Sequence, residues 1–269
     1  KMSSSLGQPI VVDNKPGAAG TIGMADALRQ PADGYTIYLL SSASLVAPLL
    51  FPTQSINFNQ IEPVGHMAWS YNVLVAPVTS ALKGPSDIVQ TAKAKPGTLS
   101  FASGGNGTPA HLAGELFKQQ TGTFITHIPY RGAGPALNDT VGGQVPLIFD
   151  NLPSALPFIN SNKLVPIVVA APQRLSQLPN VPTFKEVGLE PVNRMAFYGI
   201  YGPKGLPKDV IDKINAGVKK VLEDPAVRKR IEDTGSLVVG NSPEQFAEQI
   251  KAEFEVYKKV VDSAKLRLD

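Results

Sequence analysis

The sequence predicts an α/β protein of two lobes, each built on a doubly wound parallel sheet. Short apolar runs alternate with helical patterns along the whole chain, and this order is typical of parallel sheets with helices between the strands. Several of the runs are continuously apolar, as expected for strands that helices cover on both faces. A length of 269 residues with 24 glycines and 24 prolines fits two lobes made of many short elements.

Nine segments are expected to be strands because they are rich in Val, Ile, Leu and Tyr and are bounded by Gly, Pro or Ser. A turn or a helical pattern follows most of them, which favours crossover connections. The expected strands are Ile10–Asp13, Tyr35–Leu40, Val64–Ala68, Asn72–Ala76, Leu99–Ser103, Thr126–Tyr130, Val145–Asp150, Val165–Ala170 and Phe197–Tyr201.

The expected helices are recognised by their termini. Ser242 is followed by Pro at the first helical position and by Gln245 three residues after the cap, so a helix is expected from there to about residue 265. Pro207 is expected to open another helix, which Asp224-Pro225 interrupts. Lys1–Leu6 has the pattern of a helix's last turn, and this implies that something precedes it.

The chain is expected to cross between the lobes twice, at Ala76–Pro85 and at Leu189–Met195. One lobe then comprises residues 1–76 plus 193–269, and the other comprises residues 77–192. The first lobe is therefore built from both ends of the chain, with the second inserted between them.

The composition excludes several classes of function. A net charge of +3, from 25 basic and 22 acidic residues, is too small to indicate a nucleic-acid partner. The basic residues between Lys219 and Arg230 lie among acidic ones and are interpreted as a solvated face. The absence of cysteine excludes disulfides and thiolate chemistry. No run reaches the roughly 20 apolar residues of a membrane span.

Three loops of small residues follow expected strands and precede expected helices, where α/β proteins bind ligands. Glycine lets the backbone approach a ligand, and helix N-termini offer unpaired N–H groups. For any one loop, a turn with a helix cap is the simpler interpretation. Three such loops, two in one lobe and one in the other, favour a shared cleft. Their candidate ligand-binding residues are Ala19, Gly20, Thr21, Ser42, Ala43, Ser103, Gly104, Asn106, Gly107 and Thr108.

Three further residues are considered. Asp150 ends an apolar strand, so it either caps the next helix or faces the cleft and accepts a hydrogen bond there. Arg131 could clamp a carboxylate, but a surface Arg at a strand end is commoner. Phe197 could form an apolar wall with Tyr198, and core packing explains both equally well. Asp150 and Phe197 are kept as candidate ligand-binding residues.

Backbone and hydroxyl donors are sufficient to hold a carboxylate. A micromolar affinity corresponds to about −8 kcal/mol. Hydrogen bonds to a charged group contribute roughly 1.5–3 kcal/mol each, and a helix terminus adds about 0.3–2 kcal/mol. A few such donors reach this range before ordering costs are counted, so an Arg is not required.

No catalytic or metal-ligating pattern stands out. The three histidines, His66, His111 and His127, lie in no H-E-x-x-H or H-x-H pattern, and there is no G-x-S-x-G elbow. His111 is the one near the expected cleft, and packing or bracing of the loop is favoured for it. The glycine spacing of the first loop differs from a dinucleotide fingerprint. We therefore expect no cofactor, no metal and no catalysis.

Six motifs occur in order across nearly the whole chain: Asn14–Gly23, Asp33–Thr36, Gly107–Leu112, Tyr130–Gly132, Phe149–Asn151 and Gly202–Pro207. Together they resemble the Bug family, the periplasmic receptors of tripartite tricarboxylate transporters. The resemblance implies a type II periplasmic binding fold, with a hinge between two lobes and an interlobe cleft. It also implies a ligand carboxylate held mainly by backbone amides, hydroxyls and waters.

The resemblance further implies a receptor that delivers a di- or tricarboxylate, an acidic amino acid or an aromatic carboxylate to membrane permease subunits. We expect a monomer. Family members begin with a strand and a glycine-rich loop, which would precede Lys1 here, and they usually have Trp where this chain has Phe197. The alternatives are a ligand sensor for a signalling partner and, less favoured, an enzyme acting on a small acid.

Overall fold

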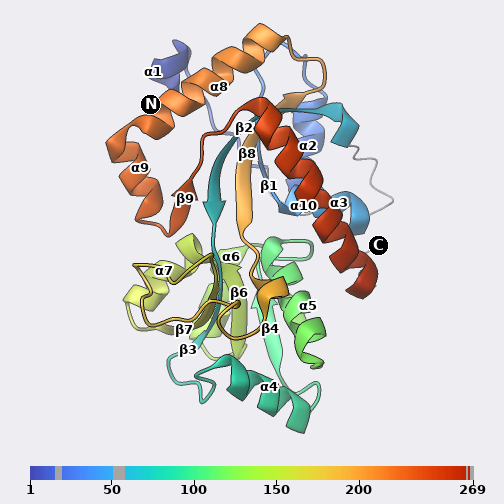
Figure 1. The fold of residues 1–269 in the computed structure, drawn as a ribbon, viewed down its shortest axis with the longest axis vertical. Coiled ribbons are helices and arrows are strands. Elements are labelled where there is room, and N and C mark those ends of the chain that lie inside the picture. The colour runs from blue at the N-terminus through green and yellow to red at the C-terminus, as the bar shows by residue number, and fades with distance from the viewer. Residues whose placement is uncertain (16–19, 51–57, 265, 267–269) are drawn as a thin grey trace. The chain divides into compact units, whose positions relative to one another are not determined.

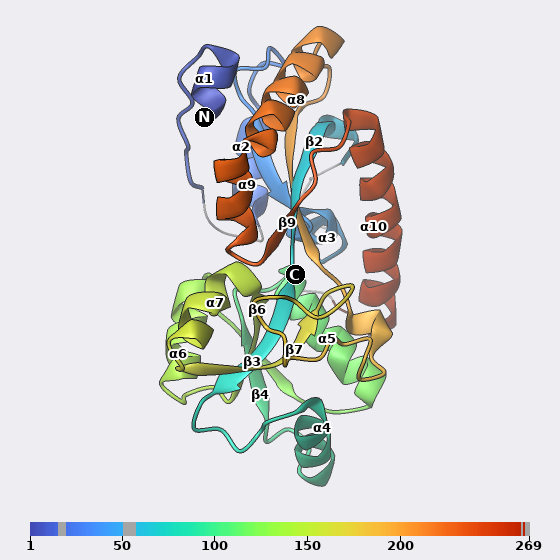
Figure 2. The same cartoon turned by 60° about the vertical axis from the view of Figure 1, so that its left-hand side comes forward.

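The structure, a computed structural model, describes residues 1–15, 20–50, 58–264 and 266. The chain divides into two compact units (Figures 1 and 2). Unit 1 is Lys1–Trp69 together with Phe197–Asp269, and unit 2 is Ser70–Ala196. These boundaries lie several residues from those expected from the sequence, so that the strand beginning at Asn72 belongs to unit 2.

Unit 1 contains the strands β1 (Tyr38–Ser41), β2 (Ile61–Ser70), β8 (Ala196–Pro203) and β9 (Ser236–Val238). They form one sheet in the order β1-β8-β2-β9. Strands β1 and β8 are antiparallel, with Tyr38 opposite Tyr201 and Ser41 opposite Tyr198. Strand β9 was not expected, because three residues are too few to show an alternating pattern.

The helices of unit 1 are α1 (Met2–Leu6), α2 (Thr21–Leu28), α3 (Ala43–Leu50), the 3-10 helix η2 (Phe58–Gln60), α8 (Lys208–Glu223), α9 (Pro225–Glu232) and α10 (Pro243–Ala264). Helix α1 packs on α8, and α10 packs on α3. Apolar residues of α8, among them Val218 and Leu222, pack with Val64 of β2 and Ile200 of β8 into one buried cluster. This burial holds the C-terminal helices to the sheet.

The caps expected from the sequence are confirmed. The amide of Gln245 donates to Ser242 Oγ at 3.2 Å, and the amide of Ser242 donates to Gln245 Oε1 at 3.0 Å. This reciprocal pair satisfies two donors that a helix start leaves unpaired. Asp224 caps α9 by accepting from the amides of Ala226 and Val227. The short helix α1 ends at Gly7, which has a φ of 70°.

One expected strand is wrong. Ile10–Asp13 forms no strand, and Val11 and Val12 are 87% and 77% exposed. The β-branched run gave the strand signal, but no strand in the described part of the chain pairs with it. The first loop therefore does not follow a strand as expected.

Unit 2 contains the strands β3 (Asn72–Pro77), β4 (Ser100–Ser103), β5 (Thr126–Pro129), β6 (Leu147–Asn151) and β7 (Leu164–Ala170). Their order is β5-β4-β6-β3-β7. Strand β4 runs parallel to β5 and β6, whereas β3 is antiparallel to both β6 and β7. The sheet is therefore mixed, which differs from the parallel sheet expected. A crossover helix between two strands makes them parallel, but β3 follows β2 without such a helix. The apolar pattern of β3 shows that the strand is buried, and it does not show in which direction the strand runs.

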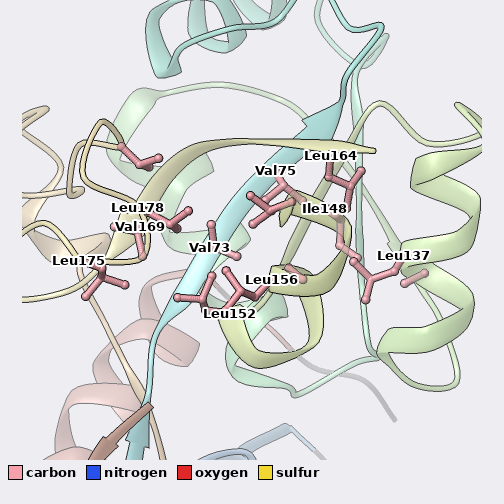
Figure 3. Packing of buried hydrophobic residues seen from close by; sticks show 14 of the residues in the cluster. Val73, Val75, Leu137, Ile148, Leu152, Leu156, Leu164, Val169, Leu175 and Leu178 are labelled. Carbon is pink, nitrogen blue, oxygen red and sulfur yellow. The ribbon is translucent and has the colours of Figure 1, made fainter. Parts of the chain in front are cut away.

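The helices of unit 2 are α4 (Pro85–Ala94), α5 (Pro109–Thr121), α6 (Ala133–Val141), α7 (Leu152–Asn160) and the 3-10 helix η3 (Glu190–Val192). Figure 3 shows Val73 of β3 and Ile148 of β6 in a buried cluster with Leu152 and Leu156 of α7. Helix α5 packs against β4 and β6. The sheet is thus covered by helices, as the continuously apolar strands indicated.

Helix α5 lies unusually close to β4 because it carries Gly114. A Cβ on Gly114 would lie 2.3 Å from the ring of Phe101. We predict that Gly114→Ala destabilises unit 2 by about 1–3 kcal/mol through overpacking, although Ala is the better helix former by about 1 kcal/mol.

Gly142→Ala is the matched control, because Gly142 at the end of α6 has a φ of −72° and a Cβ there would meet its nearest atom at 3.4 Å. It should change stability by less than about 1 kcal/mol. Urea denaturation compares the two variants, and equal stability would contradict the close packing of α5.

Candidate functional site

In unit 1, Ser42 follows β1 directly and Ala43 begins α3. The amide of Ser42 donates to the carbonyl oxygen of Phe197 at 3.1 Å, which ties the loop to β8. The side chain of Ser42 is fully buried, and its Oγ has no hydrogen-bond partner among the described residues. A buried hydroxyl without a partner is costly, so Ser42 Oγ is suited to a ligand or an ordered water.

Gly20 and Thr21 lie at the start of α2, and Ala19 lies outside the described residues. Gly20 has a φ of 89°, and a Cβ there would lie 2.9 Å from the hydroxyl oxygen of Tyr38. That hydroxyl donates to the carbonyl oxygen of Gly20. Glycine is thus required at this position both by conformation and by space.

Phe197 is not an exposed wall. Its side chain is fully buried and packs edge to face on Trp69 and Phe246, with ring centroids 5.9 and 5.7 Å away. His66 completes this group, and burial lowers its pKa. The structure therefore supports the core-packing interpretation of Phe197. Sequence reasoning missed Trp69, the half-buried neighbour of Phe197 and the single Trp of the chain.

In unit 2, the third loop connects β4 to α5 and is held by its own hydrogen bonds. Ser103 Oγ accepts from the amide of Gly105 at 3.2 Å. Thr108 Oγ1 donates to the carbonyl oxygen of Gly105 at 2.7 Å and accepts from the amide of His111 at 3.3 Å. Thr108 is therefore the N-cap of α5. The amide of Gly132 donates to the carbonyl oxygen of Gly104 at 3.0 Å, which joins this loop to the start of α6.

The amide of Gly107 points inward. It donates to Nδ1 of His111 at 3.1 Å, so it is not a free donor for an anion as its position at a helix start suggested. The amides of Asn106 and Ala110, at the same loop and helix start, make no hydrogen bond within the described residues. These two amides are among the donors that the loop can offer to a ligand.

Asp150 is the residue before the last of β6 and is 3% exposed. Burial raises the pKa of Asp150 from 3.8 to about 7, and the amide of Asn151 partly opposes this rise. Asp150 Oδ2 has no hydrogen-bond partner among the described residues. The N-cap residue of α7 is Asn151 and not Asp150, so the capping interpretation of Asp150 is wrong.

Two buried polar residues, Ser70 and Asn72, were missed from the sequence. Asn72 lies opposite Asn151 across β3 and β6, and its Nδ2 donates to the carbonyl oxygen of Arg194 at 2.9 Å. Asn72 Oδ1 and Ser70 Oγ are buried without a partner among the described residues. A polar residue on either side of Tyr71 within an apolar run was the available signal.

Arg131 and the groups that could hold a metal ion remain to be placed in the structure. Arg131 is exposed and follows β5, while Tyr130 beside it donates its hydroxyl to Asp139 Oδ2 at 2.7 Å. No group of His, Cys, Asp or Glu side chains in the described ranges is placed to hold a metal ion. Among the same residues, no helix combines the length and the apolar character needed to cross a membrane.

Two α/β units, with polar loops at strand ends that carry buried donors, define the class of periplasmic solute-binding proteins. The family model of the tripartite tricarboxylate transporter family receptor matches residues 1–266. The chain belongs to this family, and it is a periplasmic solute-binding receptor of the Bug type.

Curated relatives agree with this assignment. A protein encoded in the tcbD-tcbE intergenic region of Pseudomonas sp. is 34% identical over 263 residues, which cover 97% of this chain and 78% of that protein. Protein BugT of Bordetella pertussis is 34% identical over 247 residues, which cover 91% of this chain and 76% of BugT.

Solved structures match over the whole fold. A structure of a periplasmic transporter is 40% identical, with a TM-score of 0.94, and the match covers all of this chain and 90% of the other. An R. palustris protein solved with adipate is 28% identical, with a TM-score of 0.94 and 99% and 90% coverage. MatC from Rhodopseudomonas palustris with bound malate is 29% identical, with a TM-score of 0.90 and 97% and 90% coverage. The shared hinge and cleft expected from the sequence stay predictions.

The raised pKa of Asp150 predicts an effect on stability. Because the folded state holds this proton more tightly than the unfolded chain does, the stabilisation is fully present below about pH 4 and is lost as the pH rises through about 7. Asp150→Asn removes the titration. The variant should therefore gain stability relative to the wild type between pH 4 and 8, by at most about 4 kcal/mol.

Urea denaturation at a series of pH values measures this difference. Asp209→Asn, a change of one exposed carboxyl in α8, is the control for the altered charge. If the Asp150→Asn and Asp209→Asn profiles run parallel across this range, Asp150 titrates as an ordinary exposed carboxyl.

Proposed function

We propose that this receptor captures a small carboxylate in the periplasm and delivers it to the membrane permease subunits of a tripartite transporter. The observation that carries the proposal is the loop from Ser103 to Ala110. It brings free amides and a helix start to the end of a buried strand. Such a site favours an anion through fixed dipoles and without a cationic side chain.

The contacts that we propose come from both units. Ser42 Oγ, the start of α2 at Gly20 and Thr21, and the start of α3 at Ala43 belong to unit 1. Unit 2 contributes the loop residues Ser103, Gly104, Asn106, Gly107 and Thr108, with Asp150 as a group that gives or accepts a hydrogen bond. In this set, Gly107 shapes the loop and Asn106 donates.

The ligand class that we propose is the dicarboxylates. Two of the similar structures hold adipate and malate, each of which has two carboxylates. A few amides and hydroxyls suffice for a micromolar affinity, because hydrogen bonds to a charged group contribute roughly 1.5–3 kcal/mol each. The unpartnered buried oxygens at Ser42, Ser70 and Asn72 give further polar groups that a second carboxylate or its waters can satisfy.

A panel of acids tests this proposal. We expect malate, adipate or another dicarboxylate to raise the melting temperature in a saturable way, because binding to the native state stabilises it. The matching monocarboxylates and neutral amides are controls that should give smaller shifts. Chromatography of the recovered ligand should show no chemical change. A panel without any shift, or a ligand that is turned over, would refute a receptor for this class.

The source of the binding energy is tested by two single changes. Asn106→Asp keeps the shape of the side chain and adds one negative charge beside the loop amides, so it should weaken binding by about tenfold or more. Arg131→Ala removes an exposed cation and should cost about 1 kcal/mol or less. Calorimetric titration of folded variants decides between them. A large loss for Arg131→Ala with normal binding by Asn106→Asp would make Arg131 the anchor.

A further inference from the structure

Two histidine rings lie directly beneath the ligand-binding loop of unit 2. His111 of α5 and His127 of β5 stack with their ring centroids 4.1 Å apart and an interplanar angle of 18°. On its other side, His127 stacks on Phe101 of β4, at 4.8 Å and 27°. His111 is 3% exposed. The rings thus form a stack, buried at Phe101 and His111 and partly exposed at His127, that connects α5, β5 and β4.

Each histidine also holds one end of the loop. His127 Nε2 lies 2.7 Å from Ser103 Oγ, at the residue where β4 ends. His111 Nδ1 accepts from the amide of Gly107, where the chain turns with a φ of 77° before α5 begins. Between these two points lie Gly104, Gly105 and Asn106. The stacked pair therefore fixes both ends of the segment that carries the free amide of Asn106.

The contact between His111 and the Gly107 amide requires an uncharged ring. His111 Nδ1 can accept from an amide only when it carries no proton, so the proton of the neutral ring sits on Nε2, 3.8 Å from Glu115 Oε1. Glu115 is already paired with Lys118 at 2.8 Å. Burial lowers the pKa of His111 to about 4, and the positive charge of Lys118 acts in the same direction. Burial also lowers the pKa of His127 to about 3, and the neighbouring His111 and Lys118 lower it further.

We propose that His111 and His127 are positioning residues, a neutral ring pair that aims the amides of the Ser103–Ala110 loop at the ligand carboxylate. This inference rests on the proposed function. The role is to position the loop, and it involves neither metal ligation nor catalysis. A proton on Nδ1 of His111 would break its contact with the Gly107 amide, and a positive charge on either ring would lie against its stacked neighbour.

Matched variants of His111 test the amide contact. His111→Asn keeps an acceptor close to the position of Nδ1, whereas His111→Leu removes the acceptor and keeps the bulk. With malate and adipate as probes in calorimetry near pH 7.5, the Leu variant should bind about threefold to tenfold more weakly, as expected for one lost hydrogen bond. The Asn variant should stay near the wild type. If both bind like the wild type, or both lose affinity equally, the positioning role is refuted.

His127→Phe provides a second test that does not depend on His111. It keeps the stacked ring and removes the contact with Ser103 Oγ, so a loss of affinity reports the hydrogen bond and not the packing. Unchanged affinity with a normal melting temperature would limit His127 to packing.

Nitrogen NMR of the wild type tests the same inference without any ligand. His111 should carry its proton on Nε2 and should not titrate between pH 8 and 5. The Gly107 amide resonance should move from its wild-type position in His111→Leu but not in His111→Asn. Titration near 6.5, the ordinary pKa of histidine, or a proton on Nδ1, would overturn the inference. If the wild type binds neither probe, the proposed dicarboxylate function fails, and the NMR result alone decides the role of the rings.

Discussion

The contact between the ring of Phe101 and the bare backbone of Gly114 sets the position of α5 against β4 in unit 2. It lets α5 approach β4 more closely than any side chain at that position would allow. The same Phe101 ring supports His127, which supports His111. The loop above is therefore placed by a continuous path of packed atoms that begins in the core. A binding loop on such a support loses little conformational entropy when the ligand arrives.

Burial moves the ionisable groups around this loop towards their uncharged forms. The carboxyl of Asp150 has a raised pKa, and the rings of His111 and His127 have lowered ones, each with desolvation as the first cause. An anionic ligand bound at this loop, as we propose, would meet oriented dipoles and few fixed charges. A receptor that must release its ligand benefits from this arrangement, because a buried ion pair is difficult to separate.

The sequence predicted the strands and helices best where a single local signal determined each one. The capping pair of Ser242 and Gln245 and the buried runs of β3 and β7 are examples. The predictions failed where the outcome depended on contacts with distant parts of the chain. The run Ile10–Asp13 has strand propensity but no partner in the described chain, and the direction of β3 depends on a connection without a crossover helix.

The positions of the candidate loops could be predicted from the sequence, but the hydrogen-bond partners of their individual atoms could not. Spacing identified the segment from Ser103 to Thr108, but it could not reveal that the Gly107 amide turns inward to His111. His127 was considered only for metal binding and catalysis. Its contact with Ser103 could not be predicted, because the two residues come from different strands and no motif spans the distance between them. Phe197 was equally ambiguous, since an aromatic residue on a strand packs inward or outward with the same local pattern.

The route of the chain also has a consequence for how the protein acquires its structure. Unit 2 is continuous in sequence, whereas β1 of unit 1 finds its partner β8 only after all of unit 2 has been made, since Tyr38 pairs with Tyr201. During synthesis, the N-terminal part of unit 1 must therefore wait with the edges of β1 unpaired, while the inserted unit can already fold. Pairings this distant in sequence are slow to form. The exposed apolar side chain of Leu39 on β1 is then a point at which a waiting chain is vulnerable to misassociation.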